Sequence, residues 1–144
     1  MTRTSGRFAA RLCAFADIRS LLEGFGRSAG LDPEDCLRLT LIVEELFTNT
    51  VRHGHGGDCD APVDVTLAVE TTQIALTYQD CAPQYDPLAA ALRADLASPL
   101  ETRAVGGLGM LLTVAMSLQA SYSYEEGRNR VELTLARRDS GSSG

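Results

Sequence analysis

The sequence predicts an α+β fold, a two-layer α/β sandwich whose helices pack on one face of a mixed, mostly antiparallel sheet. Segments with apolar residues at helical spacing alternate along the chain with pairs of short β-rich segments. Each β pair is separated by a short turn, as in an antiparallel hairpin. The chain has 144 residues, of which 44% are hydrophobic, and this suits one domain with a buried core.

The N-terminal part is expected to contain one strand and one helix. Residues 1–6 are predicted to be a flexible end, and residues 7–138 to form the domain. Phe8–Leu12 alternates weakly between apolar and polar residues, which indicates an edge strand. Asp17–Ala29 carries apolar residues at helical spacing, and Gly30 is expected to cap the C-terminus of that helix.

A second helix is predicted to begin at Asp32, which suits the N-cap, with Pro33 at the first helical position. It is expected to run to about His53, where a glycine-rich loop over residues 54–60 begins. Its core-facing stripe is formed by Leu39, Val43, Leu46 and Phe47.

Two hairpins and two further helices complete the predicted fold. A turn over residues 126–129 joins the last two strands, and the Ser/Gly-rich tail, residues 139–144, is expected to be disordered. The predicted elements are the strands Val63–Val69 and Gln73–Tyr78, the helices Leu88–Leu96 and Met110–Leu118, and the strands Ser121–Glu125 and Arg130–Ala136.

Composition excludes several classes of function. A formal net charge of −6 argues against direct nucleic-acid binding. No apolar run is long enough to cross a membrane, and no long apolar core follows Arg3 and Arg7, so neither a membrane anchor nor a signal peptide is expected. His53 and His55 lie close in sequence but have no third ligand nearby, so a metal site at this pair is not expected. No Cys-x-x-Cys pair predicts a zinc site, and free cytoplasmic thiols are expected at Cys13, Cys36, Cys59 and Cys81.

The second predicted helix carries a polar face beside its apolar stripe. Glu45, Asn49 and Arg52 fall at i, i+4 and i+7, with His53 at the edge of that face. A carboxylate, an amide and a guanidinium in one row can hold a metal ion and phosphates and can orient an attacking hydroxyl. The solvent face of an ordinary amphipathic helix explains the same residues, so this segment alone leaves both interpretations open.

Asp80 follows directly after an apolar strand. A carboxylate held there could accept a hydrogen bond from an amino group such as that of adenine. An ordinary Asx-type turn leaving a strand explains Asp80 equally well.

A glycine cluster, Gly106-Gly107-Leu108-Gly109, stands before the helix predicted to begin at Met110. Glycines allow the backbone to approach a ligand closely, and a helix N-terminus offers free N–H donors. A glycine cluster followed by a helix therefore suits the binding of an anion such as phosphate. A flexible hinge explains the same residues. The pattern is not a P-loop, because no Gly-Lys-Ser/Thr follows.

In combination, the three motifs resemble the N, G1 and G2 boxes of the GHKL (Bergerat-fold) ATPase superfamily, and in particular the bacterial anti-sigma factors that are also serine kinases. The resemblance implies that Asn49 binds magnesium and that Glu45 is the general base. It also implies that Arg52 and His53 approach the phosphates or the ribose, and that Asp80 binds the adenine amino group.

The resemblance also implies roles for residues 88–110, and the sequence departs from the family pattern at one position. Residues 88–105 match the mobile lid over the nucleotide. Ala82 stands where the G1 box usually has glycine, and a positive φ there would cost alanine about 1 kcal/mol, so Ala82→Gly is expected to tighten nucleotide binding. The nucleotide-binding segment implied by the G2 box is Gly106, Gly107, Leu108, Gly109 and Met110.

The function implied by the resemblance is that of a cytoplasmic, Mg²⁺- and ATP-dependent serine/threonine protein kinase. It would phosphorylate an anti-anti-sigma (STAS-type) protein and, in another state, hold a sigma factor. Family members are often dimers, so a homodimer is also implied. Two alternatives remain: an ATP-dependent partner-binding module without catalysis, and the catalytic domain of a sensor histidine kinase. The last ranks lowest, because those kinases often carry Asn at the position of Glu45 and no phosphoacceptor hairpin precedes the domain.

Overall fold

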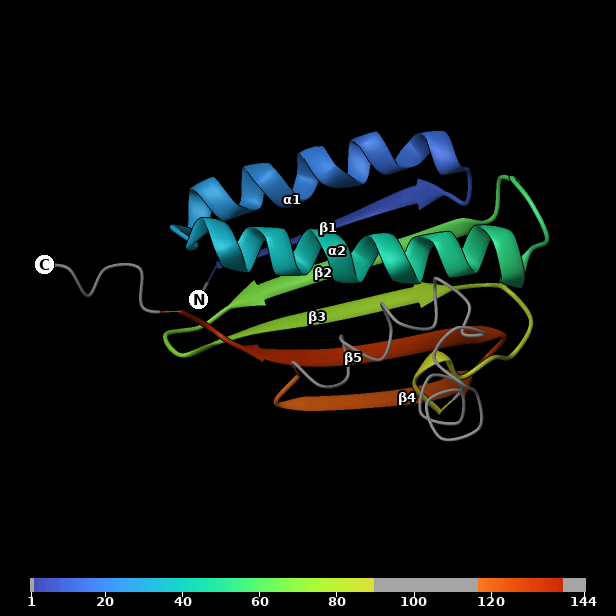
Figure 1. Ribbon diagram of the computed structural model, residues 1–144. Helices are drawn as coiled ribbons and strands as arrows, with labels where there is room; N and C mark the ends of the chain where they lie inside the picture. Colours follow the sequence, from blue (N-terminus) through green and yellow to red (C-terminus); the bar gives the residue numbers. More distant parts are fainter. Residues whose placement is uncertain (1, 90–116, 139–144) are drawn as a thin grey trace, which may run out of the picture.

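The computed structural model describes residues 2–89 and 117–138, in which two long helices cover one face of an antiparallel sheet (Figure 1). The strands are β1 (Thr2–Ala9), β2 (Pro62–Val69), β3 (Gln73–Asp80), β4 (Gln119–Glu125) and β5 (Arg128–Ala136), and the helices are α1 (Phe15–Ala29) and α2 (Pro33–Asn49).

The sheet has five strands in the order β1-β2-β3-β5-β4, so β5 lies beside β3 and places β4 at the edge. Every neighbouring pair among the described strands is antiparallel. The predicted two-layer α+β sandwich is therefore confirmed, with a sheet that is antiparallel rather than mixed in its described part.

The N-terminal strand differs from its prediction. β1 begins at Thr2 and pairs with β2 along its whole length, from Thr2 opposite Val69 to Ala9 opposite Pro62. The expected loose end over residues 1–6 is therefore wrong from Thr2 onward. This strand lies at the sheet edge and is largely exposed, so its polar residues give no apolar alternation that sequence reasoning could detect.

The helix ends were predicted from local chemistry and are confirmed. Gly30 caps α1 with a left-handed φ of 67°, which alanine would adopt only with strain. The Asp32 side chain accepts a hydrogen bond of 2.8 Å from the Glu34 backbone N–H at the start of α2, and Pro33 follows the N-cap.

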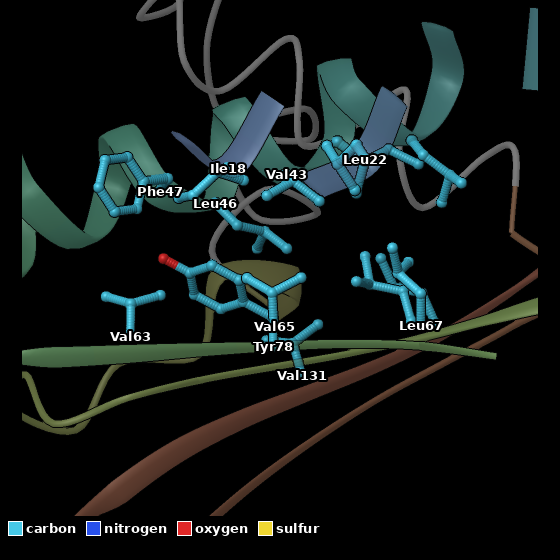
Figure 2. Packing of buried hydrophobic residues seen from close by; sticks show 14 of the residues in the cluster. Ile18, Leu22, Val43, Leu46, Phe47, Val63, Val65, Leu67, Tyr78 and Val131 are labelled. Carbon is cyan, nitrogen blue, oxygen red and sulfur yellow. The ribbon is translucent and has the colours of Figure 1, made fainter. Parts of the chain in front are cut away.

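The core lies between the helix layer and the sheet (Figure 2). β2 and β3 bury every second residue, as the pleat requires. Tyr78 stands off the sheet with its hydroxyl directed toward the helices (Figure 2). Residues that meet in this core include Ile18, Leu22, Val43, Leu46, Phe47, Val63, Val65, Leu67 and Val131.

The last hairpin turns over two residues, Glu126 and Gly127, with φ angles of 54° and 76°. Two consecutive positive φ angles match the twist of the flanking strands. The predicted turn over residues 126–129 is therefore too long, and Asn129 belongs to β5.

Two predicted helices fall largely outside the described residues. Of Leu88–Leu96, only residues 88 and 89 are described, and they are helical. Of Met110–Leu118, residues 117 and 118 are described and are not helical. The lid over residues 90–105 and the glycine segment Gly106–Gly109 lie outside the described residues. Within residues 2–89 and 117–138, no helix has the length and apolarity to span a membrane.

Candidate functional site

The polar end of α2 continues as a π-helix over Thr50–Gly54, closed by a hydrogen bond of 2.9 Å from the His55 N–H to the Thr50 carbonyl. A π-turn is wider than an α-turn and is frequent at functional sites. Here Thr50 is buried, whereas Arg52 and His53 are exposed. The sequence predicted a helix to His53 but gave no sign of the wider turn.

Asp80 ends β3 and is nearly buried, with 9% of its surface exposed. The Thr50 hydroxyl donates to Asp80 Oδ2 at 2.7 Å, and Tyr78 Oη lies 2.7 Å from Thr50 Oγ1. Burial, helped by the charge of Asp80 and opposed by the hydrogen bond to Thr50, raises the pKa of Tyr78 well above its ordinary value. Tyr78 therefore stays neutral and can donate to Thr50, whose own hydroxyl proton has two acceptors within reach, Asp80 Oδ2 and the Leu46 carbonyl at 3.0 Å.

Asn129 is the cross-strand partner of Asp80 and was missed by sequence reasoning. Its Nδ2 donates to Asp80 Oδ1 at 2.8 Å. The same nitrogen donates to the backbone carbonyls of Ala82 and Pro83 at 3.0 and 3.2 Å. The signal that could have found it was an amide residue opposite Asp80, but the turn pattern placed Asn129 outside the strand.

These polar groups line a pocket whose other walls are largely apolar. A buried acceptor among apolar walls suits a flat aromatic ring that carries an amino group. Asn49 lines the same pocket from α2, while Arg52 and His53 do not. The lining residues are Leu46, Asn49, Thr50, Gly54, Tyr78, Asp80, Ala82, Pro83, Tyr85, Pro87, Asn129 and Val131.

Ala82 is not strained. Among the described residues other than glycine, Glu126 alone has a positive φ, so the expected strain at Ala82 is wrong. Its methyl group is buried and faces Gly54, where an added Cβ would lie 2.7 Å from the Ala82 Cβ. The alanine therefore fills a notch that Gly54 leaves open, and it forms part of the pocket wall.

Glu45 lies one helical turn before Asn49, and both side chains are half-buried. Glu45 Oε1 is buried and has no hydrogen-bond partner among the described residues. Burial, with a smaller contribution from the charge of Glu44, raises the pKa of Glu45. A carboxylate with unmet hydrogen-bonding capacity and raised basicity is suited to accept a proton.

The comparison with protein families decides the identity of this domain. The family model described as the histidine kinase-like ATPase domain matches residues 8–135, which is most of the chain. The chain belongs to this family. No curated protein matches the sequence of this ATPase domain.

Several solved structures share the fold of this domain. The ATPase domain is similar to the RsbU and RsbW domains of Rv1364c from Mycobacterium tuberculosis, with a TM-score of 0.63 and 18% identity, covering 96% of this chain and 33% of that one. It is similar to a chain of the SiaB–SiaC complex from Pseudomonas aeruginosa, with a TM-score of 0.60 and 14% identity over 92% of this chain and 89% of that one.

Histidine kinase AdeS from Acinetobacter baumannii also resembles this ATPase domain, with a TM-score of 0.50 and 16% identity over 96% of this chain and 70% of that one. At these identities the likeness shows the fold alone. The chain spans about one third of the length of the Mycobacterium protein.

Proposed function

We propose that this ATPase domain binds magnesium and ATP and transfers the γ-phosphoryl group to a serine or threonine of an anti-anti-sigma (STAS-type) partner. In another state it would hold a sigma factor, and it would act in the cytoplasm. The observation that carries the proposal is one pocket that both Asp80, at the end of β3, and Asn49, from α2, line, with Glu45 one turn before Asn49.

ATP recognition rests on Asp80. Its carboxylate accepts hydrogen bonds from Thr50, Asn129 and the Ala82 N–H, three of roughly four acceptor positions. The remaining capacity would accept the 6-amino group of adenine. Guanine presents a carbonyl oxygen at that position, which an oxygen acceptor rejects.

Magnesium would depend on the nucleotide for most of its ligands. Among the described residues, no group of three or more His, Cys, Asp or Glu could hold a metal ion. Magnesium is usually bound by one or two protein oxygens together with substrate phosphates. The Asn49 amide lines the pocket and makes no capping hydrogen bond with the helix that follows it, so its oxygen fits such a ligand. When bound, the ion would offset charge on the phosphates.

Transfer would use Glu45 as the base. The partner hydroxyl oxygen would form a bond to the γ-phosphorus, the bond from that phosphorus to the bridging oxygen would break, and ADP would leave. The hydroxyl proton would pass to Glu45, whose raised pKa improves it as an acceptor. The buried Oε1 without a described partner supports this role.

A partner protein is supported by the structural neighbours. One is part of a SiaB–SiaC complex, and another carries an RsbW domain in one chain with an RsbU domain. We extend this arrangement to the present chain as a proposal, including the sigma factor, the STAS-type partner and a homodimer.

The binding half of the proposal is tested by calorimetry with ATP, with and without magnesium. We expect a dissociation constant in the micromolar to millimolar range, about −4 to −8 kcal/mol. Asn49→Ala should remove the effect of magnesium, and Asp80→Asn should weaken the preference for ATP over GTP. An absence of heat together with an absence of thermal shift at high ATP would refute nucleotide binding.

The transfer half is tested with labelled ATP and candidate partner proteins encoded near the gene. Label on a partner serine or threonine that disappears in Glu45→Ala supports the kinase. The matched control is Glu44→Ala, because Glu44 is exposed and directly precedes Glu45 in α2. ATP binding without transfer to any partner would favour the partner-binding module instead.

A further inference from the structure

The amide of Asn129 makes contacts with both of its ends. Nδ2 faces three oxygens, those of Asp80 Oδ1, the Ala82 carbonyl and the Pro83 carbonyl. Oδ1 accepts from the Tyr85 backbone N–H at 3.0 Å and from the Tyr122 hydroxyl. Its side chain therefore joins β5, β3, β4 and the loop over residues 81–86 at one buried point.

We propose that Asn129 is the positioning residue that sets the orientation of the Asp80 carboxylate and of the loop wall, so that recognition of the 6-amino group of a purine depends on it. This inference rests on the proposed ATP binding and deepens it. Asn129 acts through Asp80 and the loop rather than through the phosphates.

The orientation of Asp80 is set from both sides. Thr50 donates to Oδ2 at 2.7 Å, and Asn129 donates to Oδ1 at 2.8 Å. Without Asn129, the Ala82 N–H at 3.1 Å remains the described donor to Oδ1. A carboxylate torsion is broad when nothing restrains it, so the oxygen that would meet the purine amino group would then sample several directions.

The loop wall depends on the same side chain. The carbonyls of Ala82 and Pro83 both accept from Asn129, and the Tyr85 N–H donates to it. Ala82, Pro83 and Tyr85 all line the pocket. A terminal amide combines two donor protons with an acceptor in one plane, which neither a hydroxyl nor an aliphatic side chain provides.

A comparison of two ligands distinguishes a role of Asn129 in orienting Asp80 from a general loss of the pocket. Purine riboside 5′-triphosphate has the ring, the ribose and the phosphates of ATP but lacks the 6-amino group. We expect Asn129→Ala to weaken ATP binding by about 10-fold or more and binding of the purine riboside 5′-triphosphate by less than about 3-fold. A double-mutant cycle that combines Asn129→Ala with loss of the ligand's 6-amino group isolates the coupling between Asn129 and that group.

A purely structural role predicts a different result. Equal losses for both ligands would show that Asn129 only supports the wall, and unchanged ATP binding would show that Asp80 needs no second restraint. Either result overturns the inference. If the wild type binds neither nucleotide, the proposed function fails and the inference falls with it, so the wild-type titration distinguishes the two failures.

Two further variants guard against a folding defect. Asn129→Val removes the amide but keeps a side chain of strand-favouring shape, and it should give the same separation between the two ligands. Tyr122→Phe removes one contact to Asn129 Oδ1 and leaves Nδ2 in place. It should therefore change ATP affinity by less than about 3-fold, and thermal unfolding without ligand reports whether each variant is folded.

Discussion

At the scale of single residues, the site depends on pairs that are distant in sequence and close in space. Gly54 ends the π-helix, and Ala82 lies in the loop after β3. The methyl group of Ala82 occupies the space that a side chain at Gly54 would need. The substitution of alanine for the expected glycine is thus accommodated by its neighbour, and the strain expected at Ala82 from the family pattern does not arise.

Exchanging the two residues tests this packing. Gly54→Ala should lower the free energy of unfolding by about 1–3 kcal/mol, because the new Cβ meets the Ala82 Cβ at 2.7 Å. Gly54 does not have a positive φ, so backbone strain does not confound the result. Adding Ala82→Gly should recover most of the loss. Additive effects in chemical denaturation would show that the two positions do not share this space.

Ala82→Gly alone should leave ATP affinity unchanged or lower it, because glycine loosens a loop wall that is unstrained. This reverses the tightening expected from the sequence. Calorimetry on the single variant decides between the two expectations, and a tighter complex would mean that the methyl group crowds the ligand.

Glu45 links stability and chemistry at one residue. Burial raises its pKa above the ordinary 4.5, so the folded state favours the protonated form. The ionised side chain at pH 7 therefore costs stability, and Glu45→Gln should raise the thermal midpoint at neutral pH. This advantage should grow as pH rises from about 4.5 through the raised pKa and should vanish below 4.5.

The same variant should reduce transfer to a partner by about 10²-fold while ATP affinity changes only a few-fold. In the wild type, the transfer rate should rise with pH through the raised pKa of Glu45 and then level off. Glu44→Gln serves as the matched control and should keep most of the activity. A Glu45→Gln variant that loses ATP binding would point to a magnesium ligand or a structural role instead.

At the scale of elements, the end of β5 is attached to the start of α2. The buried carboxylate of Asp35 accepts from Arg38 Nη1 at 3.0 Å and from the Arg138 backbone N–H at 2.8 Å. Arg137 reaches the Ala29 carbonyl at the end of α1. These contacts fix the helix layer on the sheet at the end where α2 begins, opposite the end where α2 and β3 finish (Figure 1).

Asp35→Ala should therefore lower the free energy of unfolding by about 1–3 kcal/mol, because it leaves a donor at this junction without its acceptor. The control is Glu34→Ala, which removes an exposed ion pair with Arg138 and should change stability by less than about 1 kcal/mol. Denaturant titration of both variants measures the difference. If Asp35→Ala and Glu34→Ala lowered the free energy of unfolding equally, the buried Asp35 contacts would contribute no more to stability than the exposed ion pair.

At the scale of the whole molecule, the pocket lies where α2, β3 and β5 meet, at one end of the two-layer sandwich. A ligand there contacts both layers, so its binding should be coupled to global stability. Magnesium and ATP at about 100 times the dissociation constant should stabilise the fold by roughly 2.7 kcal/mol. Thermal unfolding measures this, and Asn49→Ala should reduce the shift seen with magnesium. If ATP raised the unfolding temperature equally with and without magnesium and in Asn49→Ala, the ligand would bind elsewhere.

Local chemistry in the sequence determined much of the fold. The cap at Asp32 and the terminator at Gly30 act within a few residues, and the structure confirms both. It also confirms the strands predicted from the alternation of Val63–Val69 and from the apolar, β-rich run Gln73–Tyr78. The sequence places Glu45 and Asn49 one turn apart on a helix, and their roles, which the family resemblance implies, stay a prediction. The glycine segment at Gly106 lies outside the described residues.

Tertiary structure alone decided how Asp80 is held. Thr50 is 30 residues and Asn129 is 49 residues from Asp80 in sequence, and no local pattern joins them. The two-residue turn at Glu126–Gly127 leaves Asn129 in β5 opposite Asp80, and Thr50, at the junction of α2 and the π-helix, donates to the same carboxylate. Sequence periodicity reports which face of an element is buried, but the register between strands decides which buried polar groups meet.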